Sequence, residues 1–205
     1  MPVMSKVERA FCRSAPWQSF TGRVVLPWLL GGTELRGHVL EIGSGPGANG
    51  QALLERHGSV QLTATDLDPV MVAAARRRLA PYGRRVAVAE ADATDLPFDD
   101  DGFDAAVSLL MLHHVIDWRD ALVEVARVLR PGGTVVGYDL MDRLTARIVH
   151  LADRSPHRLL APDDLAEGLA AAGFTAVEVD TAAGGTVARF RAAVPEDGHQ
   201  REPRT

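Results

Sequence analysis

Short apolar runs alternate with longer amphipathic segments over most of the chain. The run at 103–109 is almost continuously apolar, which is typical of a strand covered on both faces. Because strands and helices alternate, the pattern predicts an α/β fold with a parallel, doubly wound sheet. We expect strands at 39–42, 60–65, 85–90, 103–109 and 134–138, and helices at 47–57, 69–80, 118–129 and 163–172.

The C-terminal part departs from this alternation. Two apolar runs, 176–180 and 186–193, are joined by a turn that contains Gly184 and Gly185. This pattern predicts a hairpin, so the last strand should run antiparallel to its neighbour. The polar residues that follow, 195–205, predict a disordered tail.

The N-terminal part precedes the first strand. Segments 3–12 and 16–30 predict two helices, which form a helical cap over residues 1–36 and could cover a ligand crevice. We interpret Trp17 and Trp28 as packing against the sheet, because large aromatic side chains are usually buried, with ligand contact as the alternative.

Length, composition and charge narrow the classes of function. The chain has 205 residues with 46% hydrophobic and 24% charged residues, as expected for one globular domain, which we place at 37–194. Its formal charge of −5 gives no basic field for nucleic acid. Cys12 is the only cysteine, which suits a reducing cytoplasm. The longest N-terminal apolar run, 24–30, is too short to cross a membrane.

The candidate ligand site begins in residues 38–50, which read HVLEIGSGPGANG. An apolar strand ends at Gly43, Gly45 and Gly47, and a helix follows; such a turn brings backbone N–H groups close to a ligand. Gly43, Gly45 and Ala48 fit a dinucleotide fingerprint, for which Asp66 would be the ribose-binding acid. The same stretch also fits E-x-G-x-G-x-G, with Glu41 as the acid, so this stretch alone leaves both interpretations open.

Four further segments extend the second interpretation. LTATDLDP follows the second strand, AEADATDLPF the third, FDAAVSLLMLHHV contains the fourth, and EVARVLRPGG precedes the fifth. With residues 38–50, they resemble the successive motifs of class I S-adenosylmethionine-dependent methyltransferases over about residues 37–193. The resemblance implies a Rossmann-like, seven-stranded sheet in the order 3-2-1-4-5-7-6, with the last strand antiparallel. It also implies S-adenosylmethionine as the cofactor.

The resemblance assigns roles to individual residues. Asp66 would hold the ribose and Leu109 would lie near the sulfonium. The other implied residues are Glu41, Gly43, Gly45 and Gly47 around the methionyl group, and Leu67, Asp92 and Ala93 around the adenine. Asp92 could instead cap a turn, and Glu41 could be a buried acid satisfied by backbone amides. Asp68 is expected to cap the helix that begins at Pro69.

The chemistry at the acceptor is less defined. His113 and His114 follow the fourth strand and are candidate general bases for a hydroxyl acceptor, with packing and hydrogen bonding as the alternative role. The acceptor would be a small molecule. Hydroxyl groups of sugars, lipids, quinols or polyketides, or an amine, are all open, and the acceptor site could be open or completed by a homodimer. Asp139, Asp142, His150, Asp153 and His157 could ligate a metal, but their spacing specifies no site, so we assign none.

A non-catalytic cofactor-binding protein and a nicotinamide-linked oxidoreductase are the alternative functions.

Overall fold

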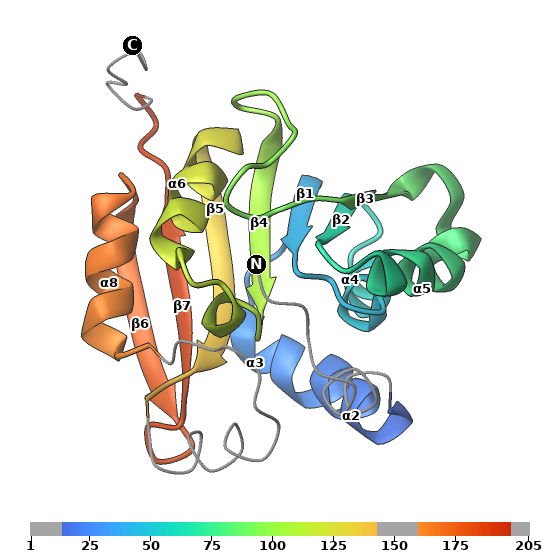
Figure 1. Ribbon diagram of the computed structural model, residues 1–205, viewed down its shortest axis with the longest axis horizontal. Helices are drawn as coiled ribbons and strands as arrows, with labels where there is room; N and C mark the ends of the chain where they lie inside the picture. The colour runs from blue at the N-terminus through green and yellow to red at the C-terminus, as the bar shows by residue number, and fades with distance from the viewer. Residues whose placement is uncertain (1–13, 143–159, 198–205) are drawn as a thin grey trace.

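The computed structural model describes residues 14–142 and 160–197 as one sheet covered by helices on both faces (Figure 1). The strands form a seven-stranded sheet in the order β3-β2-β1-β4-β5-β7-β6, in which β7 is antiparallel to both of its neighbours. The predicted fold class is therefore confirmed. The strands are β1 (Gly37–Ile42), β2 (Val60–Asp66), β3 (Val86–Glu90), β4 (Phe103–Leu109), β5 (Leu129–Leu140), β6 (Thr175–Ala182) and β7 (Val187–Ala193).

The helices between the strands lie close to their predicted positions. They are α4 (Ala48–Arg56), α5 (Pro69–Leu79), α6 (Trp118–Val128) and α8 (Pro162–Ala171), with short 3₁₀ turns at Ala80–Arg85 and Leu112–His114. Asp68 accepts a hydrogen bond from the Val70 N–H at 2.8 Å, which confirms its predicted role as the N-cap of α5. The predicted helix 3–12, Cys12 and most of the C-terminal tail lie outside the described residues.

The segment predicted as a helix at 16–30 has three parts. An α-helical turn, α2 (Ala15–Phe20), passes into a π-helical turn (Thr21–Val25) and then into α3 (Leu26–Leu30). Pro27 lies just beyond the π turn and has no N–H to donate, which interrupts regular α-helical bonding. Arg189 and Arg191 of β7 donate to the carbonyl oxygens of Trp28 and Leu30 at 2.9 and 3.0 Å, so this segment is anchored on the sheet.

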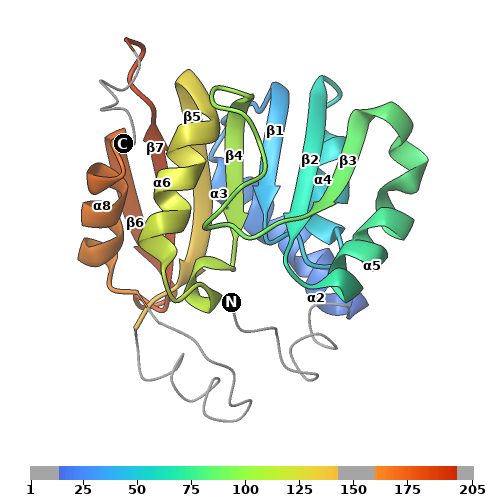
Figure 2. The same cartoon turned by 45° about the horizontal axis from the view of Figure 1, so that its top comes forward.

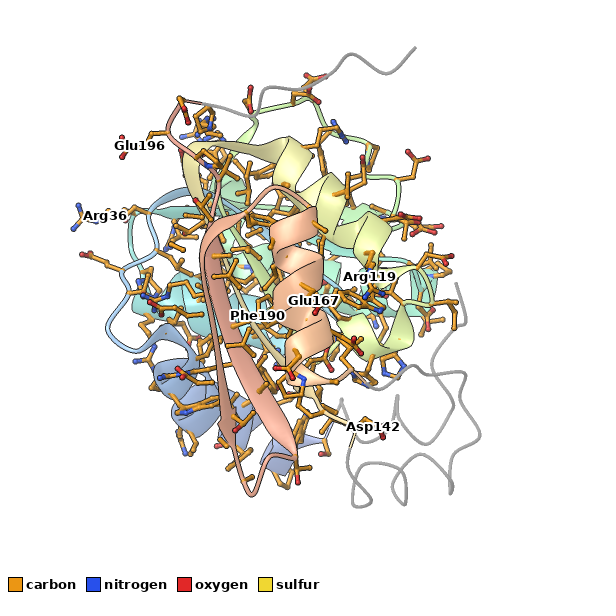
Figure 3. All side chains as sticks on the ribbon, turned by 90° about the vertical axis from the view of Figure 1, so that its left-hand side faces the viewer. Arg36, Arg119, Asp142, Glu167, Phe190 and Glu196 are labelled. Carbon is orange, nitrogen blue, oxygen red and sulfur yellow. The ribbon has the colours of Figure 1, made fainter. Side chains whose placement is uncertain are left out.

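Side chains on alternate positions of the strands build two cores, one on each face of the sheet. On one face, Leu40 and Ile42 pack with α6 and α8. On the other, Val39 and Val107 pack with α3 and α4. Figure 2 shows α6 and α8 together on one face, and Figure 3 shows α8 over the β6–β7 hairpin, where the buried ring of Phe190 lies.

The parallel register brings four strand ends to one edge of the sheet. Ile42 is paired with Thr65 of β2 and with Ser108 of β4. Leu109 is in turn paired with Tyr138 of β5. The carboxyl ends of β1, β2, β4 and β5 therefore lie side by side, and α2 lies at the same edge (Figure 2). No helix in residues 14–142 and 160–197 combines the length and apolar character that spanning a bilayer requires.

Candidate active site

A pocket opens at this edge, where ligands usually bind in doubly wound folds. Its wall combines the turn after β1, the ends of β2, β4 and β5, and the first turns of the N-terminal segment. It is lined by Trp17, Gln18, Thr21, Gly43, Ser44, Gly45, Pro46, Ala48, Asn49, Asp66, Leu67, Asp68, Leu109, Leu110, Met111, His114, Val115 and Tyr138.

The glycine turn is held in place by close packing on both sides. Gly43 has a φ of 66°, and a Cβ atom at this position would lie 2.7 Å from the Cβ of Met111. Gly47 has a φ of 79° and caps α4; a Cβ there would lie 3.1 Å from the Cα of Ala75. Glycine is therefore required at both positions, by backbone conformation and by space.

Asp66 connects the end of β2 to the glycine turn. One of its carboxylate oxygens, Oδ2, accepts from the Gly45 N–H at 2.8 Å, and Oδ1 accepts from the Asp68 N–H at 2.9 Å. Burial raises the pKa of Asp66, and these two backbone hydrogen bonds partly oppose that rise by stabilising the carboxylate. The acid thus lies in the pocket and is already held by amides of the two loops that frame it.

Glu41 lies behind the glycine turn and is fully buried. Neither of its carboxyl oxygens has a hydrogen-bonding partner among the described residues. The alternative prediction, that backbone amides satisfy this buried acid, is therefore wrong for the described part of the chain. A Cβ atom on Gly50 would lie 2.7 Å from Oε2, which shows how tightly α4 covers the acid. Burial, and then the negative charge of Asp66, raise the pKa of Glu41 to about 8. Glu41 is therefore mainly protonated at neutral pH.

Asp92 and Ala93 lie away from this pocket's lining. The Oδ1 atom of Asp92 accepts from the N–H and the hydroxyl of Thr94, at 2.9 and 2.7 Å, so the side chain caps its own turn. Ala93 is buried and packs in the core on the α6 side. The N–H of Ala91 donates to the Asp66 carbonyl at 3.1 Å, which fixes this loop beside the end of β2.

The two histidines occupy different environments. His114 lines the pocket, whereas His113 is 2% exposed and lies beneath it. The Nδ1 atom of His113 is 2.5 Å from Oδ1 of Asp139, which is fully buried in β5. The imidazole rings of His113 and His114 are in contact, with centroids 4.0 Å apart and planes at 42°.

The β4 end of the pocket has a strained backbone. Leu110 has a φ of 58°, which is rare for a residue with a branched side chain, and its N–H donates to the Tyr138 carbonyl at 2.9 Å. Strain of this kind is common at functional sites, where the surrounding structure over-determines the conformation. It turns the chain so that Leu110 and Met111 both line the pocket.

The structure brings six of the predicted site residues to the lining of one pocket: Gly43, Gly45, Asp66, Leu67, Leu109 and His114. Gly47 and Glu41 support the turn from behind, His113 lies under His114, and Asp92 and Ala93 lie farther along the sheet edge. Trp28 packs edge-on against Tyr138 with ring centroids 6.4 Å apart, as expected of a packing residue. Trp17 lines the pocket, which agrees with the alternative role of ligand contact.

The sequence interpretation missed Tyr138 and Met111. Tyr138 ends the predicted fifth strand, so the rule that parallel strand ends meet at one edge was the signal that could have found it. Met111 had no such signal, because its place depends on the left-handed conformation of Leu110. Among described residues no cluster of three histidine, cysteine, aspartate or glutamate side chains could hold a metal, and His150, Asp153 and His157 lie outside them.

Comparison with known proteins identifies the family. Residues 39–133 match a family model described as a methyltransferase domain. The chain is 35% identical over 208 residues to a demethylmenaquinone methyltransferase of Clavibacter sepedonicus, and the match covers 89% of this chain and 81% of that protein. The chain belongs to the class I S-adenosylmethionine-dependent methyltransferases. It is also 34% identical to the O-methyltransferase cnsE of Penicillium expansum, over 69% of this chain and 53% of that protein.

Solved structures show the same fold at low sequence identity. A methyltransferase from a Haloferax volcanii complex with Trm112 has a TM-score of 0.77 at 20% identity, covering 94% of this chain and 99% of that one. The [4+2]-cyclase SpnF has a TM-score of 0.75 at 22% identity, covering 89% and 84%. Because one of these neighbours is named as a cyclase, the fold alone does not specify the reaction.

The cofactor of this methyltransferase is S-adenosylmethionine, and the chemistry of the pocket fits it. An acid at the end of β2 can accept hydrogen bonds from ribose hydroxyls. The Ser44 hydroxyl beside it is buried in the pocket wall and has no hydrogen-bonding partner among the described residues, which suits a polar ligand. The glycine turn leaves room for the ligand to approach the main chain.

Proposed function

We propose that this methyltransferase transfers the methyl group of S-adenosylmethionine to a hydroxyl group of a small, uncharged molecule, with His114 as the general base. The observation that carries the proposal is that His114 lines the same pocket as Asp66 and the glycine turn. A base beside the cofactor site can remove the hydroxyl proton while the oxygen takes the methyl group.

The cofactor supplies an electrophilic methyl group on a sulfonium, and the protein has to hold it and exclude water. In our proposal Asp66 binds the ribose hydroxyls, and Leu67, with Asp92 and Ala93 along the same edge, binds the adenine. Gly43, Gly45 and Gly47 shape the methionyl part of the site, with Glu41 buried behind them. Leu109 lies near the sulfonium.

The acceptor end of the pocket supports an apolar, uncharged acceptor. Its lining includes the side chains of Trp17, Met111, Val115 and Tyr138, which offer aromatic and aliphatic contact surface. Among the described residues no lysine or arginine lines this pocket, so nothing there would neutralise a phosphate or carboxylate on the acceptor. A planar ring that carries a hydroxyl group is the acceptor that suits these contacts.

Methylation at carbon is the second candidate, and the similarity to relatives named as ubiquinone/menaquinone biosynthesis C-methyltransferases favours it. A ring hydroxyl that loses its proton becomes nucleophilic at oxygen and also at the neighbouring ring carbons. His114 would remove the same proton in both reactions, so the position of the acceptor relative to the cofactor decides the product.

A screen with isotopically labelled S-adenosylmethionine tests the proposal. The panel should contain phenols, naphthols and reduced quinones, with phosphorylated amines as the charged comparison. We expect label in a hydroxylated aromatic product, and fragmentation by mass spectrometry will assign it to oxygen or carbon. Label only in phosphorylated amines would contradict the proposed acceptor class. Tight cofactor binding without turnover on any hydroxylated acceptor or cellular metabolite extract would favour the non-catalytic alternative.

A further inference from the structure

The buried pair of His113 and Asp139 lies directly beneath the pocket. Asp139 is fully buried near the end of β5, and its Oδ1 atom is 2.5 Å from Nδ1 of His113. The Oδ2 atom of the same carboxylate accepts from the backbone N–H of His113 at 3.3 Å, and Oδ1 accepts from the backbone N–H of Leu140 at 2.7 Å. Several contacts therefore fix the carboxylate and the imidazole relative to each other.

The ring of His113 also contacts the ring of His114, which lines the pocket. The ring of His114 rests against that of His113, with centroids 4.0 Å apart, and its backbone N–H donates to the Met111 carbonyl at 3.0 Å. One of these rings faces the buried carboxylate and the other lines the pocket. The order from the interior to the pocket is Asp139, His113, His114.

Stability alone is a weak explanation for this arrangement. Two ionisable side chains, 0% and 2% exposed, both lose their hydration on folding. A buried pair of this kind commonly stabilises a protein less than a well-packed apolar pair of similar size. A gain in the positioning of a neighbouring reactive group accounts for its location under a pocket residue.

We propose that Asp139 and His113 are positioning residues for His114. Asp139 holds the ring of His113, and this ring holds the imidazole of His114 toward the acceptor. When the acceptor reacts, its O–H bond would break and the proton would form an N–H bond on His114, while an oxygen electron pair bonds to the methyl group. The bond from the methyl carbon to the sulfur would break at the same time, its electron pair would stay on the sulfur, and S-adenosylhomocysteine would leave. The resulting positive charge on His114 is stabilised by the Asp139 carboxylate across the intervening ring, and the proton then passes to water.

This inference rests on the proposed function, and a double-mutant cycle on turnover tests it. Asp139→Asn keeps the shape of the side chain and removes its charge. At saturating S-adenosylmethionine and acceptor, we expect this change to lower kcat about tenfold or more, with KM and the affinity for S-adenosylhomocysteine within about twofold of wild type. In a His114→Ala background, Asp139→Asn should lower kcat no further, because residues that act through one group are not additive. Asp120→Asn, on the exposed side of α6, is the matched control and should leave kcat unchanged.

A second variant removes the same side-chain contact from the other partner. His113→Phe keeps a ring under His114 but cannot bond to Asp139, and we expect a similar loss of kcat. The readout that is independent of turnover is the NMR spectrum of ¹⁵N-labelled histidine rings. Asp139→Asn should shift the signals of both His113 and His114, whereas Asp120→Asn should shift neither.

The outcomes separate this inference from the proposed function. If His114→Ala keeps wild-type kcat, the base itself is wrong and the proposed function fails with it. If His114→Ala loses kcat while Asp139→Asn and His113→Phe keep it, only the positioning inference is wrong. Multiplicative losses in the double variant, or an Asp139→Asn effect confined to the melting temperature, would also overturn it.

Discussion

Asp66, at the end of β2, accepts a hydrogen bond of 2.8 Å from the N–H of Gly45, in the turn that follows β1. The acid that we propose to bind ribose is therefore part of the same unit as the glycine turn that shapes the methionyl site. A change at either residue should alter the whole cofactor site, and cofactor binding is the property to measure.

Asp66 and Asp68 should respond differently to substitution by alanine. Asp66→Ala removes the proposed charge-assisted contact with the ribose and should weaken binding of S-adenosylhomocysteine by about 1–3 kcal/mol. Asp68→Ala removes the cap of α5 and should lower the free energy of unfolding by about 1 kcal/mol. Because Asp68 also lines the pocket, we expect some loss of affinity, but a smaller one than for Asp66→Ala. Calorimetric titration and urea denaturation of both variants measure the contrast. Equal losses of affinity would show that the ribose site is assigned to the wrong acid.

Glu41 should make the stability of the protein depend on pH. Its pKa is about 8 in the folded state, above the usual value of 4.5, so the folded protein holds a proton that the unfolded chain releases. The stability that this proton provides is full below pH 4.5 and is lost as the pH rises toward 8. Glu41→Gln removes this dependence, and we expect the variant to gain about 1–3 kcal/mol relative to wild type between pH 5 and pH 8.

Urea denaturation across this pH range measures that difference. Glu55→Gln is the control, because Gln51 and Tyr82 lower the pKa of Glu55 and confine its effect to acid pH. Asp66, whose pKa is also raised, is present in both proteins, so its own titration contributes to both curves. A constant difference between Glu41→Gln and wild type from pH 5 to pH 8 would mean that Glu41 is ionised throughout.

Trp17 should affect the acceptor rather than the cofactor. Loss of an aromatic contact costs about 0.5–1.5 kcal/mol, so Trp17→Ala should raise the KM of a ring-containing acceptor roughly twofold to tenfold. Phe20→Ala is the matched control, because Phe20 is 48% exposed and its ring centroid lies 5.8 Å from that of Trp17. Steady-state kinetics with both variants test this. A similar rise in KM in the two would indicate a general disturbance of α2.

The sequence predicted the sheet well because its signals are local. Apolar runs, the glycines at 43–47 and the Gly184–Gly185 turn each specify nearby backbone, and the order of strands followed from the resemblance to the family. β5 was predicted at 134–138, ending at Asp139, but extends from Leu129 to Leu140. Pairing with β4 and β7 decides that length, and such pairing is not encoded in the segment itself.

The site was less predictable because its contacts cross the chain. His113 and His114 are adjacent in sequence, yet a carboxylate 26 residues away faces one of them while the other lines the pocket. Trp17 reaches the pocket because α3, later in the same N-terminal segment, is anchored on β7. Asp92 was assigned to the adenine from the motif, and that role remains a prediction, since its carboxylate bonds to Thr94 in this structure.

The melting temperature in the presence of S-adenosylhomocysteine and of NAD tests the central claim most directly. A ligand that binds only the folded protein stabilises it by about 2.7 kcal/mol at 100 times its dissociation constant. We predict a saturable rise in melting temperature with S-adenosylhomocysteine, reduced in Asp66→Ala, and no rise with NAD or NADP at the same concentrations. A rise with NAD and none with S-adenosylhomocysteine would contradict the account and return the glycine turn to the dinucleotide interpretation.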